Sequence, residues 1–222
     1  MLNSSVWRPP PTNNLRGELR LAAPFSLFAH CAVLKAICVY SSSSNAVAPK
    51  YFAAAEEFGR LLAQRGIVLV YGGGNVGLMG AVARAVHQHG GRVIGVIPQF
   101  MRKKEIAYEA ADELIVTKDL RERKAIMEAR ADAFVALPGG FGTLEEILEV
   151  LTLRQLQTHQ KPIAFLNVDG FFNPLLELFE QLYAHNFTKA EYRHFYHVAE
   201  RPAQVLDHFA NHKPPAVTSK WY

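Results

Sequence analysis

Residues 133–146 have the sequence AFVALPGGFGTLEE, in which five apolar residues end at Pro-Gly-Gly and a more polar stretch follows. A short apolar run that stops at Pro and Gly is typical of a buried strand. Thr143 and Glu146 stand three residues apart, which is the spacing of a capping box at a helix N-terminus. The stretch therefore predicts a strand, a glycine-rich turn and a helix that begins at Thr143.

Short apolar runs alternate with longer amphipathic stretches on both sides of this segment. The runs predict strands at Leu34–Tyr40, Ile67–Tyr71, Arg92–Ile97, Leu114–Thr117, Ala133–Leu137, Ile163–Val168 and Tyr196–Val198. The amphipathic stretches predict helices at Lys50–Arg65, Gly77–His89, Leu120–Ala131, Thr143–Leu156, Pro174–His185 and Ala203–His212. This alternation predicts an α/β fold, a Rossmann-like doubly wound parallel sheet in a single domain. Such sheets bind ligands at the carboxyl ends of the strands, where the strand order reverses.

Residues 1–33 differ from the rest, because they contain Pro9-Pro10-Pro11 and no regular apolar spacing. We predict a flexible N-terminal extension over residues 1–33, one folded domain over residues 34–212 and a C-terminal tail over residues 213–222. The arginines of the first segment leave a transit peptide as the alternative. No run reaches the roughly 20 apolar residues that a membrane span needs, so we expect no membrane partner.

The formal charge of the 222 residues is +4. Much of the excess lies in the first segment, where Arg8, Arg16 and Arg20 stand against Glu18. The rest is close to neutral, which gives little support for nucleic-acid binding. Two cysteines outside any CxxC pair exclude a disulfide framework and a zinc knuckle. We therefore expect reduced thiols and a cytoplasmic location.

Nine histidines raise the question of a metal site. His87 and His89 would lie on different faces of a helix. The pair His194 and His197 has two glutamates in its neighbourhood but no other acid or cysteine at ligand spacing. We predict no metal site and no cofactor.

Residues 71–80 have the sequence YGGGNVGLMG, a second glycine-rich turn between a predicted strand and a predicted helix. The glycines match the dinucleotide-binding pattern, but Ile97-Pro98-Gln99 stands where that pattern expects an acid. The Lys of a Walker loop is absent as well. Two interpretations remain: a tight turn that requires small residues, or a phosphate cradle of backbone N–H groups. The cradle would be built from Gly72, Gly73, Gly74 and Gly77.

Residues 121–124 have the sequence RERK at the start of a predicted helix. Positive charge in a first helical turn opposes the helix dipole, so we expect an anionic ligand or a carboxylate partner beside it. The alternative is a solvated charged face.

Four motifs together resemble the LOG family of cytokinin riboside 5′-monophosphate phosphoribohydrolases, often misnamed lysine decarboxylases. They are PGGFGTLEE at 138–146, RKAIM at 123–127, GGGNVGLMG at 72–80 and LNVDG at 166–170, in the order and spacing of that family. The resemblance extends from about Leu34 to Val198. It implies a Rossmann-like enzyme that hydrolyses the N-glycosidic bond of adenosine 5′-monophosphates, N6-substituted or not. The products would be a free base and ribose 5-phosphate.

The resemblance also implies the roles of individual residues. Arg123 and Glu146 fall on the catalytic pair of the family. Its substrate contacts fall on Glu105, Lys124, Gly140, Phe141, Gly142, Thr143, Leu144, Glu145 and Thr152. Family members are commonly homodimers whose subunits complete each other's sites, so we expect a homodimer here.

The chemistry of the two central residues leaves choices open. A carboxylate beside the sugar would stabilise an oxocarbenium-like transition state, so Glu146 is either catalytic or the capping-box residue. Arg123 never loses its proton and is therefore no base. The roles open to it are to orient Glu146, to bind ribose hydroxyls and to steady the leaving base.

One position departs from the family, whose first strand usually ends in Gly-Ser-Ser. Ser42 stands in the place of that glycine. The Ser43 hydroxyl can still donate to phosphate or ribose, so we expect altered geometry rather than loss of the loop. The preferred base is expected to depend on pocket walls near Met101, Ile106 and Tyr108.

Three other functions are alternatives. They are a nucleotide or molybdenum-cofactor carrier of the same fold, a scaffold protein with a decayed site, and a DNA-processing relative. The presence of both Arg123 and Glu146 argues against a carrier and a scaffold. The near-neutral domain argues against the DNA-processing relative.

Overall fold

The computed structural model describes residues 34–102 and 106–214. Its strands are β1 (Ala36–Tyr40), β2 (Val68–Tyr71), β3 (Val93–Pro98), β4 (Glu113–Thr117), β5 (Ala133–Ala136), β6 (Ile163–Leu166) and β7 (Tyr196–Ala199). Its α-helices are α1 (Pro49–Gln64), α2 (Gly77–Gln88), α3 (Gln99–Arg102), α4 (Leu120–Arg130), α5 (Phe141–Gln155), α6 (Asn173–Ala184) and α7 (Pro202–Ala210). Two short 3₁₀ helices are η1 (Val168–Gly170) and η2 (Ala190–Phe195).

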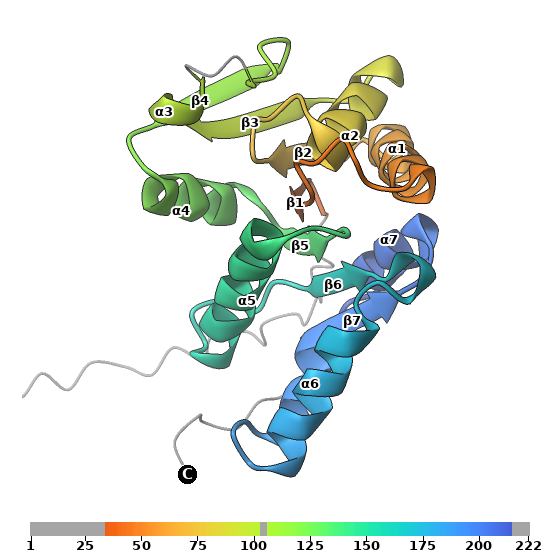
Figure 1. Ribbon diagram of the computed structural model, residues 1–222, viewed down its shortest axis with the longest axis vertical. Coiled ribbons are helices and arrows are strands. Elements are labelled where there is room, and N and C mark those ends of the chain that lie inside the picture. The colour runs from red at the N-terminus through yellow and green to blue at the C-terminus, as the bar shows by residue number, and fades with distance from the viewer. Residues whose placement is uncertain (1–33, 103–105, 215–222) are drawn as a thin grey trace, which may run out of the picture. The chain divides into compact units, whose positions relative to one another are not determined.

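Within the described residues all seven strands form one sheet in the order β4-β3-β2-β1-β5-β6-β7 (Figure 1). Neighbouring strands are parallel; Ile37 of β1 lies in register with Leu69 on one side and Ala133 on the other. The chain moves outward from β1 to β4 and then returns through α4 to β5, on the other side of β1. The strand order therefore reverses between β1 and β5, which is where such sheets bind ligands. The predicted doubly wound parallel sheet is confirmed.

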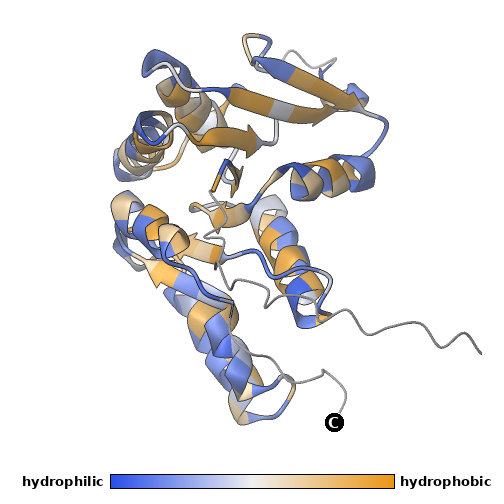
Figure 2. Ribbon diagram, turned by 180° about the vertical axis from the view of Figure 1, so that it is seen from behind, coloured by the Kyte–Doolittle hydropathy of each residue, from blue (hydrophilic) through white to orange (hydrophobic). Residues whose placement is uncertain are grey.

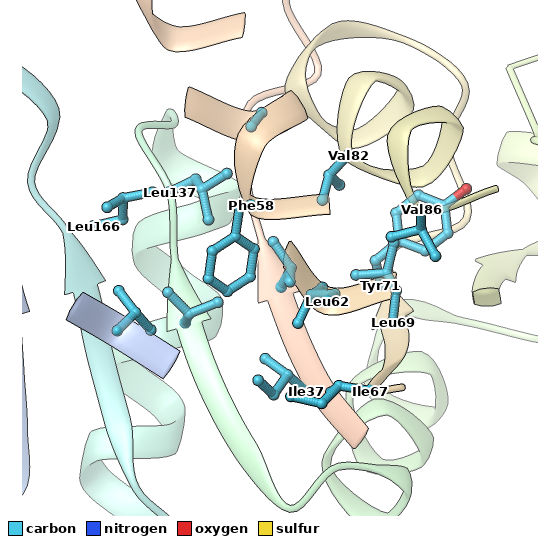
Figure 3. Packing of buried hydrophobic residues seen from close by; sticks show 14 of the residues in the cluster. Ile37, Phe58, Leu62, Ile67, Leu69, Tyr71, Val82, Val86, Leu137 and Leu166 are labelled. Carbon is cyan, nitrogen blue, oxygen red and sulfur yellow. The ribbon is translucent and has the colours of Figure 1, made fainter. Parts of the chain in front are cut away.

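Helices cover both faces of the sheet. On one face Phe58 and Leu62 of α1 and Val82 and Val86 of α2 pack against Ile37 and its neighbours (Figure 3). Helices α4, α5 and α6 cover the other face, where alternate residues of β1, Cys38 and Tyr40, point. The strands are mostly hydrophobic along their whole length, whereas the helices carry both hydrophobic and hydrophilic residues (Figure 2). Burial on both faces is the reason why the strands have near-continuous apolar sequences.

All predicted strands and helices are present, and their ends differ from the prediction by at most two residues. The elements that were not predicted are α3, η1 and η2, which are too short to have a hydrophobic period of their own. The predicted extension over residues 1–33, most of the predicted tail and Glu105 lie outside the described residues. No helix in the described part of the chain combines the length and the apolar composition that a membrane span requires.

A cluster of histidines joins β7 to α7. The rings of His197 and His208 stack with 4.1 Å between their centroids, and the ring of His212 lies 5.6 Å from that of His208. Burial lowers the pKa of His208 to about 4, and the positive charges of His197, His212 and Arg154 act in the same direction. The folded protein therefore favours the neutral form of His208.

Acidification is expected to destabilise this fold through His208. The unfolded chain takes up a proton near the ordinary pKa of 6.5, whereas the folded chain does so only near 4. The unfolding free energy therefore falls as the pH drops from about 6.5 toward 4. We expect melting temperatures measured by circular dichroism to depend less on pH in His208→Gln than in the wild type, whereas His185→Gln, at an exposed site, keeps the wild-type dependence. An unchanged dependence in His208→Gln would contradict this account.

Candidate active site

Two buried, oppositely charged side chains meet next to the point where the strand order reverses. Arg123 lies in the first turn of α4 and Glu146 in the second turn of α5, and each is 8% exposed. Nη1 of Arg123 donates to Oε1 of Glu146 at 2.5 Å. The structure thus brings together the two residues that the sequence analysis singled out as the catalytic pair.

The surroundings of Arg123 fix its guanidinium group on two further sides. Nε donates to the carbonyl oxygen of Val96, at the carboxyl end of β3, at 3.0 Å. Gly72 lies so close that a Cβ atom there would be 2.0 Å from Nη2. A side chain at position 72 would therefore displace the guanidinium group of Arg123, so the two sequence motifs are in direct contact.

The carboxyl group of Glu146 has a perturbed proton affinity. Burial raises its pKa above the ordinary value, and the charge and hydrogen bond of Arg123 act against this rise. A carboxylate in such surroundings has lost most of its hydration and depends on Arg123 to stay ionised. It is a group suited to stabilise a positive charge or to accept a proton.

Lys124 forms a second set of ion pairs between the same two helices. Its ammonium group pairs with Glu145 and lies 2.8 Å from a carboxylate oxygen of Glu149. The N-terminus of α4 is capped by Asp119, whose side chain accepts from the amide of Glu122 at 2.9 Å. The expected carboxylate partners of Arg123 and Lys124 are therefore present on α5, and Asp119 caps the helix itself.

The N-terminus of α5 is an exposed turn rich in backbone donors. The cap residue is Gly140, which has no side chain to accept the amide hydrogens of Phe141, Gly142 and Thr143. First-turn amides have no carbonyl of their own helix to bind. Space is open around Gly140 and Gly142, where a Cβ atom would meet nothing within 4 Å, and Phe141 is 92% exposed. The turn is thus accessible to an anion.

The capping-box alternative for Thr143 and Glu146 does not hold in the structure. The helix begins at Phe141, so Thr143 is its third residue rather than its cap. The side chain of Thr143 packs against Gly139, where a Cβ atom would lie 2.1 Å from Oγ1. Pro-Gly-Gly lets the chain turn earlier than the Thr-x-x-Glu spacing indicates. Glu146 is therefore free of a capping role.

Backbone amides of the second glycine-rich loop, at the N-terminus of α2, donate hydrogen bonds to other segments of the chain. The amide of Gly77 donates to Oδ1 of Asn45 at 2.8 Å, and that of Leu78 donates to the carbonyl oxygen of Ser42 at 2.9 Å. Gly77 has a φ of +58°, and a Cβ atom there would lie 2.5 Å from Ser43. These contacts favour the tight-turn interpretation for Gly77. A phosphate contact of Gly72, Gly73 and Gly74 stays a prediction.

Ser42, which replaces the usual glycine, connects three segments through its backbone. Its amide donates to the carbonyl oxygen of Pro138 at 3.2 Å, and its carbonyl oxygen accepts from Leu78 and Met79. Its hydroxyl accepts from the amide of Ser44 at 3.1 Å. The loops after β1 and β5 therefore lie side by side, and the serine fits this arrangement. The neighbouring Ser43 is exposed.

Thr152 lies away from the ion pair within one chain. Its hydroxyl donates to the carbonyl oxygen of Leu148, one turn back along α5, at 2.8 Å. It is six residues beyond Glu146, which is about 9 Å along the helix axis. Leu144 is partly buried and packs on the core from the same helix.

The sequence analysis missed Asn45 and the carbonyl of Val96, because neither stands in a recognisable spacing to Gly77 or Arg123.

In residues 34–102 and 106–214, no three His, Cys, Asp or Glu side chains stand in an arrangement suited to hold an ion.

Comparison with known proteins places the chain in a family. The family model described as "Possible lysine decarboxylase" matches residues 79–209. The probable cytokinin riboside 5′-monophosphate phosphoribohydrolase LOGL2 of Oryza sativa subsp. japonica is 44% identical over 80% of this chain and 73% of its own length. The cytokinin riboside 5′-monophosphate phosphoribohydrolase LOG7 of Arabidopsis thaliana is 44% identical over 84% of this chain and 87% of its own.

Solved structures share the fold. The molybdenum cofactor binding protein of Rippkaea orientalis aligns with a TM-score of 0.61 and 25% identity over 78% of this chain and 94% of its own. The sequence identity to the plant phosphoribohydrolases is much higher and covers most of both chains. The chain therefore belongs to the LOG family of cytokinin riboside 5′-monophosphate phosphoribohydrolases.

Proposed function

We propose that this protein hydrolyses the N-glycosidic bond of N6-substituted adenosine 5′-monophosphates, releasing a cytokinin-type base and ribose 5-phosphate. Adenosine 5′-monophosphate itself is proposed as a second substrate, with adenine as the base. The observation that carries the proposal is the buried pair of Arg123 and Glu146 beside the α5 amides. Membership of the LOG family supports the same reaction.

The proposed mechanism rests on the Glu146 carboxylate. Cleavage of the bond between C1′ and the base leaves positive charge on C1′ and O4′ of the ribose. A desolvated carboxylate next to that charge stabilises it strongly, because few water molecules screen the attraction. The same carboxylate accepts a proton from the water that adds to C1′. The bonding electrons leave with the base. The proton that Glu146 has taken from the water then passes through solvent to a nitrogen of the base, which regenerates the carboxylate.

Arg123 holds Glu146 in place for this chemistry. It is always charged, so its contribution is electrostatic and geometric. Its contacts with Val96 and Gly72 on one side and Glu146 on the other fix the carboxylate oxygen that it does not bind itself. We propose that this second oxygen faces the ribose.

Glu146→Gln is expected to lower kcat by about 10²- to 10⁴-fold, since it removes the carboxylate charge but keeps the shape of the side chain. The amide oxygen of glutamine still accepts from Arg123, so the fold is retained. Release of adenine from adenosine 5′-monophosphate, followed by chromatography, measures the effect, and circular dichroism checks the fold. A Glu56→Gln variant, on the exposed face of α1, serves as the control. A folded Glu146→Gln protein with wild-type activity would rule out the mechanism.

Phosphate recognition is the second part of the proposal. We propose that the amides of Phe141, Gly142 and Thr143 bind the 5′-phosphate, together with the Ser43 hydroxyl. Binding energy gained at the phosphate would place C1′ against Glu146 and so lower the barrier of the reaction itself.

We expect kcat/KM for a nucleoside 5′-monophosphate to exceed that for the free nucleoside by at least about 10²-fold, because the nucleoside cannot use the helix N-terminus. Adenosine, adenosine 5′-monophosphate and the N6-isopentenyl forms of both are compared in one assay of base release. Equal turnover of nucleoside and monophosphate would show that the phosphate site is absent.

We propose in addition that the protein is a cytoplasmic homodimer with shared sites. Thr152 lies away from Glu146 in its own chain, and Leu148 of α5 and Leu156, just after the helix, are exposed apolar side chains near it in sequence. Both features fit a second subunit packed on α5, which would bring its Thr152 to the neighbouring site.

A shared site predicts complementation between two inactive variants. Glu146→Gln removes the carboxylate, and Thr152→Arg blocks the position that a neighbouring subunit would present. Co-expressed with different tags and purified as the mixed dimer, the pair is expected to recover about a quarter to a half of wild-type activity, since one of two sites is intact. If each chain forms its site alone, Thr152→Arg by itself keeps wild-type activity, because Thr152 lies away from Glu146 in its own chain; a monomer in light scattering would equally refute the proposal.

A carrier of molybdenum cofactor is the second candidate, supported by the fold shared with the Rippkaea orientalis protein. The reaction assay separates the two, because a carrier releases no base. The higher identity to the plant phosphoribohydrolases favours the hydrolase.

A further inference from the structure

Three polar side chains form a hydrogen-bonded chain at the end of α2. Nδ1 of His87 lies 2.9 Å from the hydroxyl of Tyr108, and Nε2 lies 2.9 Å from Oδ2 of Asp112. The same carboxylate oxygen accepts from the amide of Val93, at the start of β3, at 2.7 Å. Both ring nitrogens of His87 are thus used, and the chain connects the sheet to the segment before β4.

The partners determine the orientation of each group. An ionised carboxylate accepts only, so Nε2 of His87 donates to Asp112, while Nδ1 of His87 and the Tyr108 hydroxyl share the second hydrogen bond. The amide of Val93 and His87 hold the pKa of Asp112 below its ordinary value, so it stays ionised. The Tyr108 ring is therefore fixed by its hydroxyl as well as by its packing against the core.

The backbone of the same segment is bound to the glycine-rich loop. The amide of Tyr108 donates to the carbonyl oxygen of Gly73 at 2.8 Å, and the amide of Asn75 donates to that of Ile106 at 2.7 Å. Gly74 and Ala107 form an isolated antiparallel bridge. Two backbone hydrogen bonds of this kind are too few to be stable alone.

The glycine-rich loop in turn contacts the catalytic arginine. Gly72 lies directly against the guanidinium of Arg123, and the Met79 side chain fills the space beside Gly72 and Gly74. A shift of this loop would change the space that Arg123 occupies. Arg84, which donates to the backbone and side-chain oxygens of Asn75, anchors the far end of the loop.

We propose that Tyr108, held by His87 and Asp112, is a positioning residue that presses the glycine-rich loop against Arg123. In this role it acts through its contact with Gly73 and through Gly72 on Arg123. The proposal rests on the proposed function, because its kinetic consequence is a change in the rate of that reaction. Its structural consequence, the order of residues 72–75, is measurable without any substrate.

Tyr108→Phe removes the hydroxyl and keeps the ring. We expect kcat to fall by about three- to tenfold, the size of one lost hydrogen bond, while KM changes by less than about twofold because the phosphate is bound at α5. Amide hydrogen exchange of a peptide covering residues 71–80 is expected to become faster. His87→Ala gives the same two effects, and His87→Gln, which keeps a donor and an acceptor, restores them in part.

The matched control is His89→Ala, in the residue that follows α2, where the ring contacts only the carbonyl oxygen of Ala85 among the hydrogen bonds found. It is expected to leave kcat and the exchange of residues 71–80 unchanged. Since Tyr108 acts through Arg123, Tyr108→Phe is also expected to have no further effect on kcat in an Arg123→Lys background.

Two results would overturn the proposal. One is unchanged exchange and unchanged kcat in Tyr108→Phe. The other is a loss of kcat that is just as large in the Arg123→Lys background, which would show an independent, merely structural role. A wild-type protein without hydrolase activity would contradict the proposed function instead, and the exchange measurement would still decide whether Tyr108 orders the loop.

Discussion

The buried ion pair between Arg123 and Glu146 is the constraint on which the arrangement of this protein depends. Removing one partner of such a pair costs about 3–5 kcal/mol, because the other charge is left without water or counter-ion. The helices that carry the two residues must therefore keep their positions relative to each other. The carbonyl oxygen of Val96 in strand β3 accepts a hydrogen bond from Arg123, and Gly72 of the glycine-rich loop leaves room for the guanidinium group because it has no side chain.

The ion pair also explains why two helices that follow different strands meet at one edge of the sheet. Lys124, the next residue of α4, forms ion pairs with Glu145 and Glu149 of α5. These ion pairs are more exposed than the inner one, so solvent screens their attraction more. The inner pair is buried, whereas the outer set adds further contacts between the same two helices. The reversal of strand order between β1 and β5 places the open N-terminus of α5 beside them.

Most of the fold could be predicted from the sequence, because fully buried strands such as β5 and amphipathic helices such as α1 have strong local patterns. The pairing of Arg123 with Glu146 followed from the family resemblance and not from any period. Contacts between distant residues had no local signal: nothing at Gly72 indicates an arginine 51 positions later, nor does Asn45 indicate Gly77. The capping-box alternative is a case of the opposite kind, because a local spacing was present but did not form the motif. The chain turns at Pro-Gly-Gly, and α5 begins at Phe141, two residues before Thr143.

Ser42 links the loops after β1 and β5 and the start of α2 through its amide and carbonyl groups alone. Ser42 is itself buried and its hydroxyl accepts from the amide of Ser44, so substitution at this site is limited to small side chains. Gly77 and Gly139 allow no side chain at all, because their missing Cβ atoms are what lets the three segments touch. Homologues of this chain are thus expected to vary among small residues at position 42 and to keep the two glycines.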